Sequence, residues 1–320
     1  MPSTSTSRPV ISRSIQTRCV VIASALLSRP AHPGNREGQH ISSARHDPTR
    51  GSDVTTPATI SPTALHDRMQ AEDLLVMQVT SPQVYAQAHL PGAVHVAPAD
   101  LIGGEPPAVG RLPPRDALLA LFRRVGLTAD RTVVTCDDEG GGWAGRLAWT
   151  LDVIGHTDWR YLDGGMHAWA AAGLPFSDTP VEPVPSSLDF DLDPRPVAEL
   201  KDVLKALDMP DTVIWDCRSA EEYAGLKRTA ARNGHIPGAV HLDWLDLMDR
   251  ERGLALAGNL EVRLAARGIT RDRDVITHCQ THHRSGLTYM AARLLGYPRI
   301  RAYHGSWSEW GNRTDTPVER

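Results

Sequence analysis

An internal repeat limits what this chain of 320 residues can fold into. Three pairs of matching segments occur in the same order: Pro91–His95 with Pro237–His241, Val133–Thr135 with Val275–Thr277, and Gly164–Trp169 with Gly305–Trp310. The first pair is identical in sequence, and the middle pair is offset by 142 residues (275 less 133). Matches of this length and order indicate two copies of one unit, each of roughly 120 residues. The sequence therefore predicts two domains built on the same plan.

Within each copy, short apolar segments alternate with segments of helical periodicity. In the first copy, the apolar runs at 74–77, 132–135 and 159–162 have the length and character of buried strands. Helical patterns cover 115–125 and 144–154, and each is followed by a glycine. Strands that alternate with helices are joined by right-handed crossovers and form a parallel sheet. The predicted fold class is α/β, with each sheet flanked by helices on both faces.

Composition divides the chain into four parts. Residues 1–57 are rich in Ser, Thr, Arg and Pro, and we expect a disordered or targeting extension. Its apolar run Cys19–Leu27 follows arginines and is a weak secretory or transit pattern. The first domain is predicted at 58–178, a proline-rich linker at 179–193 and the second domain at 194–320.

Cys279 is the most reactive side chain that the sequence predicts. The apolar run Val275–Thr277 predicts a strand, Cys279 follows it closely, and a helical pattern begins near Arg284. A cysteine between a strand and a helix N-terminus faces backbone N–H groups and the positive end of the helix dipole. This environment, together with the charge of Arg284, favours the thiolate, which is the nucleophilic form. We predict a catalytic cysteine for a substrate that carries sulfur or an oxyanion.

The repeat indicates that one copy alone is active. At the offset of 142 residues, Asp137 occupies the position of Cys279 (279 less 137), so the first copy has no cysteine at the reactive position. Its run Asp137–Glu139 would repel an anionic substrate. We expect that run to be a solvated loop or to face the domain interface. The second copy carries the basic segment His282–Arg284 instead.

Composition and cysteine usage exclude several classes of function. A formal net charge of −4 gives no support to nucleic-acid binding. No apolar run approaches the roughly 18 residues that span a bilayer, so no membrane role is predicted. The four cysteines form no CxxC pair, which suits a reducing compartment, and we expect a cytoplasmic protein with export or organelle import left open. Cys136 and Cys217 end apolar strands, where small buried side chains are more common than reactive thiols.

The chain resembles tandem-domain rhodanese-type sulfurtransferases over about residues 58–320. The segments that carry the resemblance are the Cys279 loop, Asp216–Arg218 with Glu222-Tyr223, His235–Ala239, Gly305–Trp310 and, in the first half, His89–Ala93. The resemblance implies two rhodanese-like domains, the first inactive and the second catalytic. It also implies an enzyme that moves a sulfane sulfur from thiosulfate or a related donor to cyanide or a thiol through a Cys279 persulfide, without a cofactor. The thiol acceptor could belong to another protein.

The candidate site lies around Cys279 and Arg284, the two predicted catalytic residues. Arg284, His282 and His283 would offset the negative charge of the donor, and backbone N–H groups of the loop would hold the terminal sulfur. Either histidine could donate a proton, because its unperturbed pKa of about 6.5 lies near neutral pH. The predicted substrate-binding residues are Gln280, Thr281, His282, His283, Ser285, Arg218, Asp216 and Trp307.

Two features depart from the commonest two-domain members of the family. The loop Cys279–Arg284 has no glycine at its fourth position and ends in arginine, where those members end in a threonine-alanine pair. Glu222 stands where thiosulfate and mercaptopyruvate enzymes tend to have an arginine. The second feature argues against mercaptopyruvate as the donor and leaves Arg218 as a candidate charge near the loop.

Two other functions stay open at the level of the sequence. Cysteine phosphatases and arsenate reductases have five residues between cysteine and arginine. The four residues 280–283 form a tighter ring that suits one sulfur atom better than a tetrahedral oxyanion. A metal site or a non-enzymatic sulfur carrier would use Cys and His as soft ligands, namely His278, Cys279, His282 and His283. No second cysteine or carboxylate lies at ligand spacing there, and we predict no metal.

Overall fold

The structure is a computed structural model in which residues 57–320 are described. The predicted extension at 1–57, with its weak targeting pattern, lies outside the described residues except for its last position. Within residues 57–320, no helix combines the length and the apolar character needed to cross a membrane.

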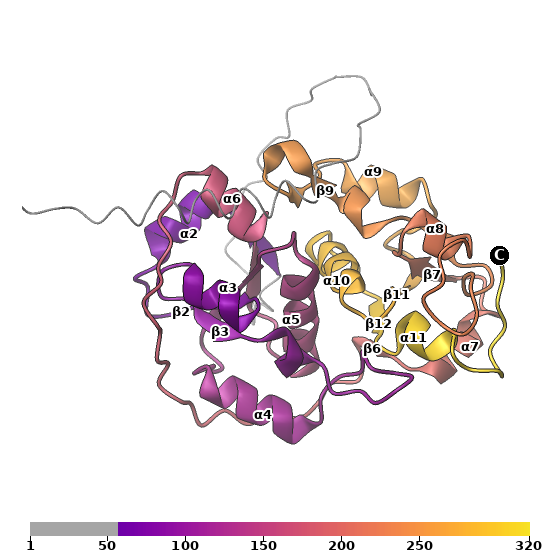
Figure 1. Cartoon of the computed structure of the whole chain (residues 1–320), viewed down its shortest axis with the longest axis horizontal. Helices are drawn as coiled ribbons and strands as arrows, with labels where there is room; N and C mark the ends of the chain where they lie inside the picture. Colours follow the sequence, from indigo (N-terminus) through magenta and orange to yellow (C-terminus); the bar gives the residue numbers. More distant parts are fainter. Residues whose placement is uncertain (1–56) are drawn as a thin grey trace, which may run out of the picture. The chain divides into compact units, whose positions relative to one another are not determined.

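The first domain is a parallel five-stranded sheet covered by helices on both faces (Figure 1). In spatial order its strands are β1 (Ala58–Ile60), β5 (Trp159–Leu162), β4 (Thr132–Asp137), β2 (Leu74–Val79) and β3 (Val94–Val96). The helices are α2 (Pro62–Arg68), α3 (Pro82–Gln87), the 3-10 helix η1 (Pro98–Leu101), α4 (Arg115–Arg124), α5 (Gly142–Val153) and α6 (Gly165–Ala171). The strands and helices predicted for this half are confirmed to within two residues at their ends.

Alternation along β2 explains why both faces of this sheet are covered. Leu75 and Met77 belong to the apolar cluster under α4 and α5, whereas Val76 belongs to the cluster under α2 and α6. Successive strand side chains point to opposite faces, so a continuous apolar run must be buried on both sides. This arrangement confirms the predicted α/β class.

The second domain repeats the same strand order. Its strands are β6 (Val197–Ala198), β12 (Ile300–Tyr303), β11 (Asp274–His278), β7 (Thr212–Asp216) and β8 (Val240–His241). A short antiparallel pair, β9 (Met248–Asp249) and β10 (Ala255–Leu256), lies outside this sheet. The helices are α7 (Leu200–Ala206), α8 (Ala220–Tyr223), η2 (Trp244–Leu247), η3 (Arg250–Arg252), α9 (Leu260–Ala265), α10 (Arg284–Leu294) and α11 (Ser306–Trp310). Equal strand order in the two sheets confirms the internal repeat.

Helices α5 and α10 form the main contact between the two domains, and Figure 1 shows them side by side between the sheets. Gly145 of α5 and Gly286 of α10 lie at the point where the helices cross. A Cβ atom on Gly145 would come within 2.3 Å of the Gly286 backbone, so side chains larger than hydrogen do not fit there. Because α10 begins at the Cys279 loop, this close crossing places the loop against the first domain.

We predict that Gly286→Ala weakens this helix crossing. The added Cβ would lie 2.5 Å from the backbone nitrogen of Arg146, and backbone atoms cannot move aside cheaply. We expect the free energy of unfolding to fall by about 1–3 kcal/mol, even though alanine favours a helix over glycine. Urea unfolding measures the change. Gly258→Ala is the control, since its Cβ meets nothing within 4 Å, and an equal loss in both variants would contradict this account of the interface.

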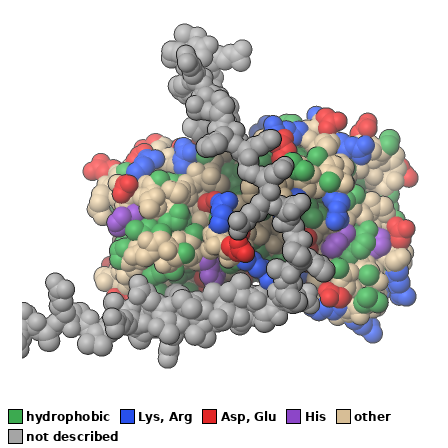
Figure 2. Space-filling model, turned by 90° about the horizontal axis from the view of Figure 1, so that it is seen from above, with side chains coloured by type: hydrophobic (Ala, Val, Ile, Leu, Met, Phe, Trp, Pro, Cys, Tyr) green, Lys and Arg blue, Asp and Glu red, His purple; other side chains and the backbone are tan. Residues whose placement is uncertain are grey.

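The surface carries both signs of charge. On the face that Figure 2 shows, acidic and basic side chains are interspersed, in keeping with the formal net charge of −4. Neither sign dominates that face. A surface of this kind has no strong long-range attraction for a polyanion.

Candidate active site

Cys279 directly follows β11 and begins the loop 279–283 that leads into α10. Loops at the carboxyl ends of parallel strands are the usual ligand sites of α/β sheets. The Cys279 side chain is buried, with 1% of its surface exposed. The Ser285 hydroxyl, in the first turn of α10, lies 3.5 Å from Cys279 Sγ and donates to it, and the Ser285 backbone N–H donates as well. The sulfur therefore sits at a helix N-terminus, as the sequence predicts.

The start of α11 fixes the backbone of this loop. The backbone N–H of Trp307 donates to the carbonyl of Cys279 at 3.0 Å, and that of Ser308 donates to the carbonyl of Gln280 at 2.9 Å. These bonds turn the loop carbonyls toward α11. The Cys279 N–H also points toward this helix, where it donates to the Ser306 hydroxyl at 3.4 Å.

Opposing effects set the pKa of Cys279. Burial raises it, because a buried thiolate loses its hydration. A hydrogen bond from the Cys217 thiol, the positive charge of Arg284 and the two bonds from Ser285 outweigh burial and bring the pKa well below its ordinary value. These contacts favour the thiolate form of Cys279 over the thiol. The sequence prediction treated Cys217 as a buried hydrophobe; it is buried, and it also contacts the reactive sulfur.

Arg284 is paired with Glu222. Its two terminal nitrogens donate to the two carboxylate oxygens at 2.6 and 3.0 Å, and the Glu222 side chain is 4% exposed. This pairing corrects the expectation that Arg284 offers a free charge to the donor. Glu222 also accepts the Ser219 backbone N–H, in a capping box at the start of α8. The sequence does not show the pairing of Arg284 with Glu222, because the two partners lie 62 residues apart.

Arg218, Asp216 and Trp307 form a buried group beneath the loop. The Arg218 guanidinium donates to both oxygens of Asp216, at 2.6 to 3.0 Å, and to the carbonyl of Gly234. It also lies over the Trp307 ring, 4.3 Å from the centroid. All three side chains are fully buried. Their predicted contact with substrate stays a prediction, and this geometry gives them a supporting position.

Three predicted residues lie at the more exposed side of the loop. The Gln280 amide donates to the carbonyl of Thr229 at 3.0 Å, and the Thr281 backbone packs against Gly110 of the first domain. The His283 ring stacks on Trp143, with centroids 4.4 Å apart. Gln280, Thr281 and His283 are all partly exposed, whereas Cys279 itself is buried.

The first domain supplies a charge partner to His283. Its Nε2 contacts the Glu139 carboxylate. Burial lowers the pKa of His283, but the hydrogen bond and the charge of Glu139 outweigh burial and raise the pKa above its ordinary value. Glu139 therefore lies at the domain interface, which is the second of the two positions expected for its run. The Glu139 carboxylate favours the charged form of His283.

Arg146 of α5 holds the loop from the first domain. Its fully buried guanidinium donates to the carbonyl of His282 at 3.3 Å and to the carbonyl of Gly110 at 2.8 Å. His282 needs such support because its φ of 55° lies in the left-handed region, which is costly for a residue with a side chain. Its ring packs edge-on against Trp149 and bonds to the Ser285 hydroxyl at 2.8 Å. Sequence reasoning missed Arg146, since nothing local marks a contact across 136 residues.

Burial lowers the pKa of Arg146 to about 9, while the negative charge of Cys279 acts in the opposite direction. At neutral pH the guanidinium is still charged. The first domain thus places a second buried cation near the thiolate, although it contributes no nucleophile of its own.

In the first domain, the loop that corresponds to 279–283 binds a carboxylate through its backbone N–H groups. The Asp137 carboxylate, at the position of Cys279, accepts the backbone N–H groups of Gly140, Gly141 and Ala144 at 3.1, 2.8 and 2.9 Å. It is fully buried, which corrects the expectation of a solvated acidic run. Ala144 lies in the first turn of α5, as Ser285, whose N–H bonds to Cys279 Sγ, lies in the first turn of α10. An internal carboxylate is held by the backbone N–H groups of the first domain, and a sulfur occupies the corresponding place in the second.

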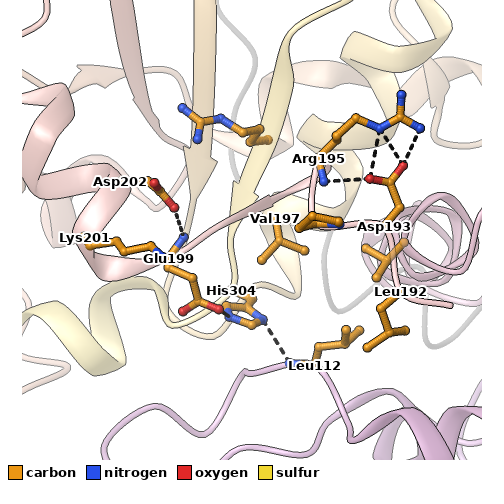
Figure 3. Close-up of a pocket in the computed structure, with 12 residues that line it drawn as sticks. Leu112, Leu192, Asp193, Arg195, Val197, Glu199, Lys201, Asp202 and His304 are labelled. Carbon is orange, nitrogen blue, oxygen red and sulfur yellow. Dashed lines mark hydrogen bonds and ion pairs between the residues drawn. The ribbon is translucent and has the colours of Figure 1, made fainter.

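A separate pocket of about 490 Å³ lies between the linker and the second sheet (Figure 3). It is lined by Leu112 and Val153 of the first domain and by residues 192–202, Arg301 and His304. Figure 3 shows the Glu199 carboxylate and the Leu112 backbone on two sides of the His304 ring, at 3.3 and 3.0 Å. The lining contains no residue of the loop 279–284, so this pocket is distinct from the sulfur site.

The residues 57–320 contain no group of three or more His, Cys, Asp or Glu side chains that could hold a metal ion. His278, one of the four ligands considered from the sequence, lies 3.7 Å from Asp216 beneath the loop. His282 points instead to Ser285 and Trp149. The four side chains therefore do not converge on one point.

The sequence model of the rhodanese-like domain matches this chain twice, over residues 61–172 and 199–313. A thiosulfate sulfurtransferase of Azotobacter vinelandii is 47% identical over 266 residues, which cover 83% of this chain and 98% of that protein. The 3-mercaptopyruvate sulfurtransferase of Escherichia coli strain K12 is 30% identical over 240 residues, which cover 74% of this chain and 85% of that protein.

A solved structure of similar fold is the anaerobic ergothioneine biosynthesis enzyme of Chlorobium limicola. It aligns with a TM-score of 0.74 over 82% of this chain and 69% of that one, at 22% identity. At this identity the likeness concerns the fold alone. The two sequence relatives, in contrast, cover most of both chains.

Proposed function

The chain belongs to the rhodanese family and is a tandem-domain sulfurtransferase, and we propose that it carries a sulfane sulfur from thiosulfate to cyanide or a thiol as a persulfide on Cys279. The observation that carries the proposal is a buried cysteine sulfur at the N-terminus of α10, where hydrogen bonds from Cys217 and Ser285 and the charge of Arg284 hold its pKa well below the ordinary value. A thiolate kept charged in a nearly dry site is a strong nucleophile toward sulfur.

The first half-reaction follows from this geometry. The Cys279 thiolate attacks the outer sulfur of thiosulfate, the sulfur–sulfur bond of the donor breaks, and its electron pair leaves with sulfite. The terminal sulfur of the persulfide then lies where the first domain holds a carboxylate, among backbone N–H groups. The N–H of Ser285 and the dipole of α10 stabilise the charge on that sulfur. A thiophilic acceptor removes it in the second half-reaction and restores the thiolate.

The charge distribution favours thiosulfate over mercaptopyruvate. A carboxylate donor needs a free guanidinium for bidentate binding. Glu222 occupies the expected arginine position, and its carboxylate already accepts from both terminal nitrogens of Arg284. His283, whose pKa Glu139 raises, is partly exposed at the loop, and its charged form can attract a small inorganic dianion.

Phosphatase or arsenate reductase activity is not favoured. The ring of four residues is tight, and the Arg284 side chain that would bind the equatorial oxygens is already bidentate to Glu222.

We propose a cytoplasmic location and a low-molecular-weight or protein thiol as the cellular acceptor, because a thiolate nucleophile works in a reducing compartment. Purified protein assayed with thiosulfate, mercaptopyruvate and an aryl phosphate in parallel tests the proposal, and turnover of the phosphate alone would defeat it.

We predict that Glu139→Gln changes the alkaline side of the pH profile. Loss of the Glu139 charge lowers the pKa of His283, so the imidazolium disappears at lower pH than in the parent. The KM for thiosulfate should then begin to rise at lower pH. Steady-state kinetics across neutral and alkaline pH measure this shift.

The acid side of the same profile depends on Cys279 and should stay in place in Glu139→Gln. Glu72→Gln, an exposed position in the first domain, is the matched control and should leave both limbs unchanged. An alkaline limb that does not move in Glu139→Gln would show that His283 does not attract the donor.

A further inference from the structure

Cys217 stands directly beside the nucleophile, on the neighbouring strand. In the parallel pair β7 and β11, Asp216 is opposite His278, and the next residues are Cys217 and Cys279. The Cys217 N–H donates to the His278 carbonyl at 3.0 Å, so the pairing continues past the strand ends. Adjacent strands lie about 4.8 Å apart, and the Cα atoms of disulfides lie about 4.4–6.8 Å apart. The spacing therefore permits a disulfide between the two cysteines.

The first domain supports this register independently. There Val79 is opposite Asp137 in the pair β2 and β4, and these residues correspond to Cys217 and Cys279. Val79 is fully buried and packs in the core. A valine thus fills the equivalent place in the inactive domain, and the fold does not require a thiol there. The cysteine occurs in the domain that has the reactive sulfur.

The surroundings favour a reaction between the two sulfurs. Cys217 and Cys279 are both buried, with 0% and 1% of their surface exposed, respectively. The Cys217 thiol already contacts Cys279 through a hydrogen bond. Burial and the neighbouring thiolate raise the pKa of Cys217, so it keeps its proton in the resting enzyme. A protonated thiol attacks slowly, which gives acceptors from solution the first opportunity to take the sulfur.

We propose that Cys217 is a resolving cysteine that gives the enzyme a second activity, the release of hydrosulfide at the expense of a dithiol reductant. Cys217 Sγ attacks Cys279 Sγ of the persulfide, and the bond from Cys279 to the terminal sulfur breaks. The terminal sulfur leaves with that electron pair and with the Cys217 proton, as hydrosulfide. The two cysteines are oxidised to a disulfide while the sulfane sulfur is reduced. Exchange with a dithiol then reopens the disulfide.

This inference rests on the proposed Cys279 persulfide. The test distinguishes a failure to form that persulfide from a failure of Cys217 to resolve it. Protein is loaded with thiosulfate, freed of small molecules and kept without an acceptor. Hydrosulfide is then measured over time, and acid-quenched peptides are mapped by mass. The parent should lose its persulfide, release one hydrosulfide per chain and yield a peptide linked through Cys217 and Cys279. In Cys217→Ser, which keeps a hydrogen-bond donor, the persulfide should last at least about 10-fold longer.

Two further variants complete the test. Cys217→Val copies the residue of the first domain, so it keeps the fold and should also retain the persulfide. Cys136→Ala, a buried cysteine of the first domain, should behave as the parent does. A parent persulfide as long-lived as that of Cys217→Ser, without a linked peptide, would overturn the resolving role and leave the sulfurtransferase intact. Failure of the parent to form any persulfide would overturn both.

Discussion

Replacing Cys279 with serine should abolish sulfur transfer from thiosulfate to cyanide. A serine hydroxyl stays protonated at neutral pH and forms no persulfide, so neither half-reaction can proceed. We expect a loss of at least about 10³-fold in kcat, since removal of a nucleophile commonly costs that much or more. Thiocyanate production under saturating thiosulfate measures it.

Cys136→Ser is the matched control for this substitution. Cys136 is equally buried, but it lies in the first domain, where its thiol contacts the Met77 carbonyl and burial keeps its pKa well above the ordinary value. Most of the activity should survive. A comparable loss in both variants would contradict the account in which one domain alone carries out the chemistry.

Replacing Arg284 with methionine should have the second largest effect, on reactivity and on stability together. The Cys279 pKa should rise, because the positive charge of Arg284 is one of the contacts that hold it down. The partner Glu222, with 4% of its side chain exposed, would stay buried without a counter-charge. Removal of one member of a buried ion pair typically costs about 3–5 kcal/mol. The pH dependence of alkylation by iodoacetamide reports the pKa, and urea unfolding reports the stability.

A double variant separates these two effects. In Arg284→Met combined with Glu222→Gln, no buried charge is left alone, so much of the stability should return. The Cys279 pKa should stay high, since the cation is still missing. Return of the low pKa in the double variant would show that Arg284 does not stabilise the thiolate.

The sequence predicts the fold well because the evidence for it is local. Apolar runs such as 132–135, and the identical segments Pro91–His95 and Pro237–His241, each mark one element within a few residues. The right-handed crossover rule then leaves few ways to arrange these elements. Cys279 could be found for the same reason, since a strand end, a cysteine and a helix start are consecutive in the chain.

The electrostatics of the site could not be predicted from the sequence. The partners of Arg284 and His283 are Glu222 and Glu139, which lie 62 and 144 residues away in the chain. From the sequence, Glu222 is notable only because it stands where related enzymes tend to have an arginine. Glu139 belongs to the first domain, and its position beside His283 depends on how α5 and α10 cross. Periodicity carries no information about that crossing. Contacts of this kind depend on the packed structure.

The most direct test of the central claim is the mass of the Cys279 peptide after brief exposure to thiosulfate and rapid acid quenching. The account predicts one added sulfur atom on Cys279, removed by cyanide and absent from the Cys136 and Cys217 peptides. An unmodified Cys279 peptide with every sulfane donor tried, or the added sulfur on another cysteine, would contradict it.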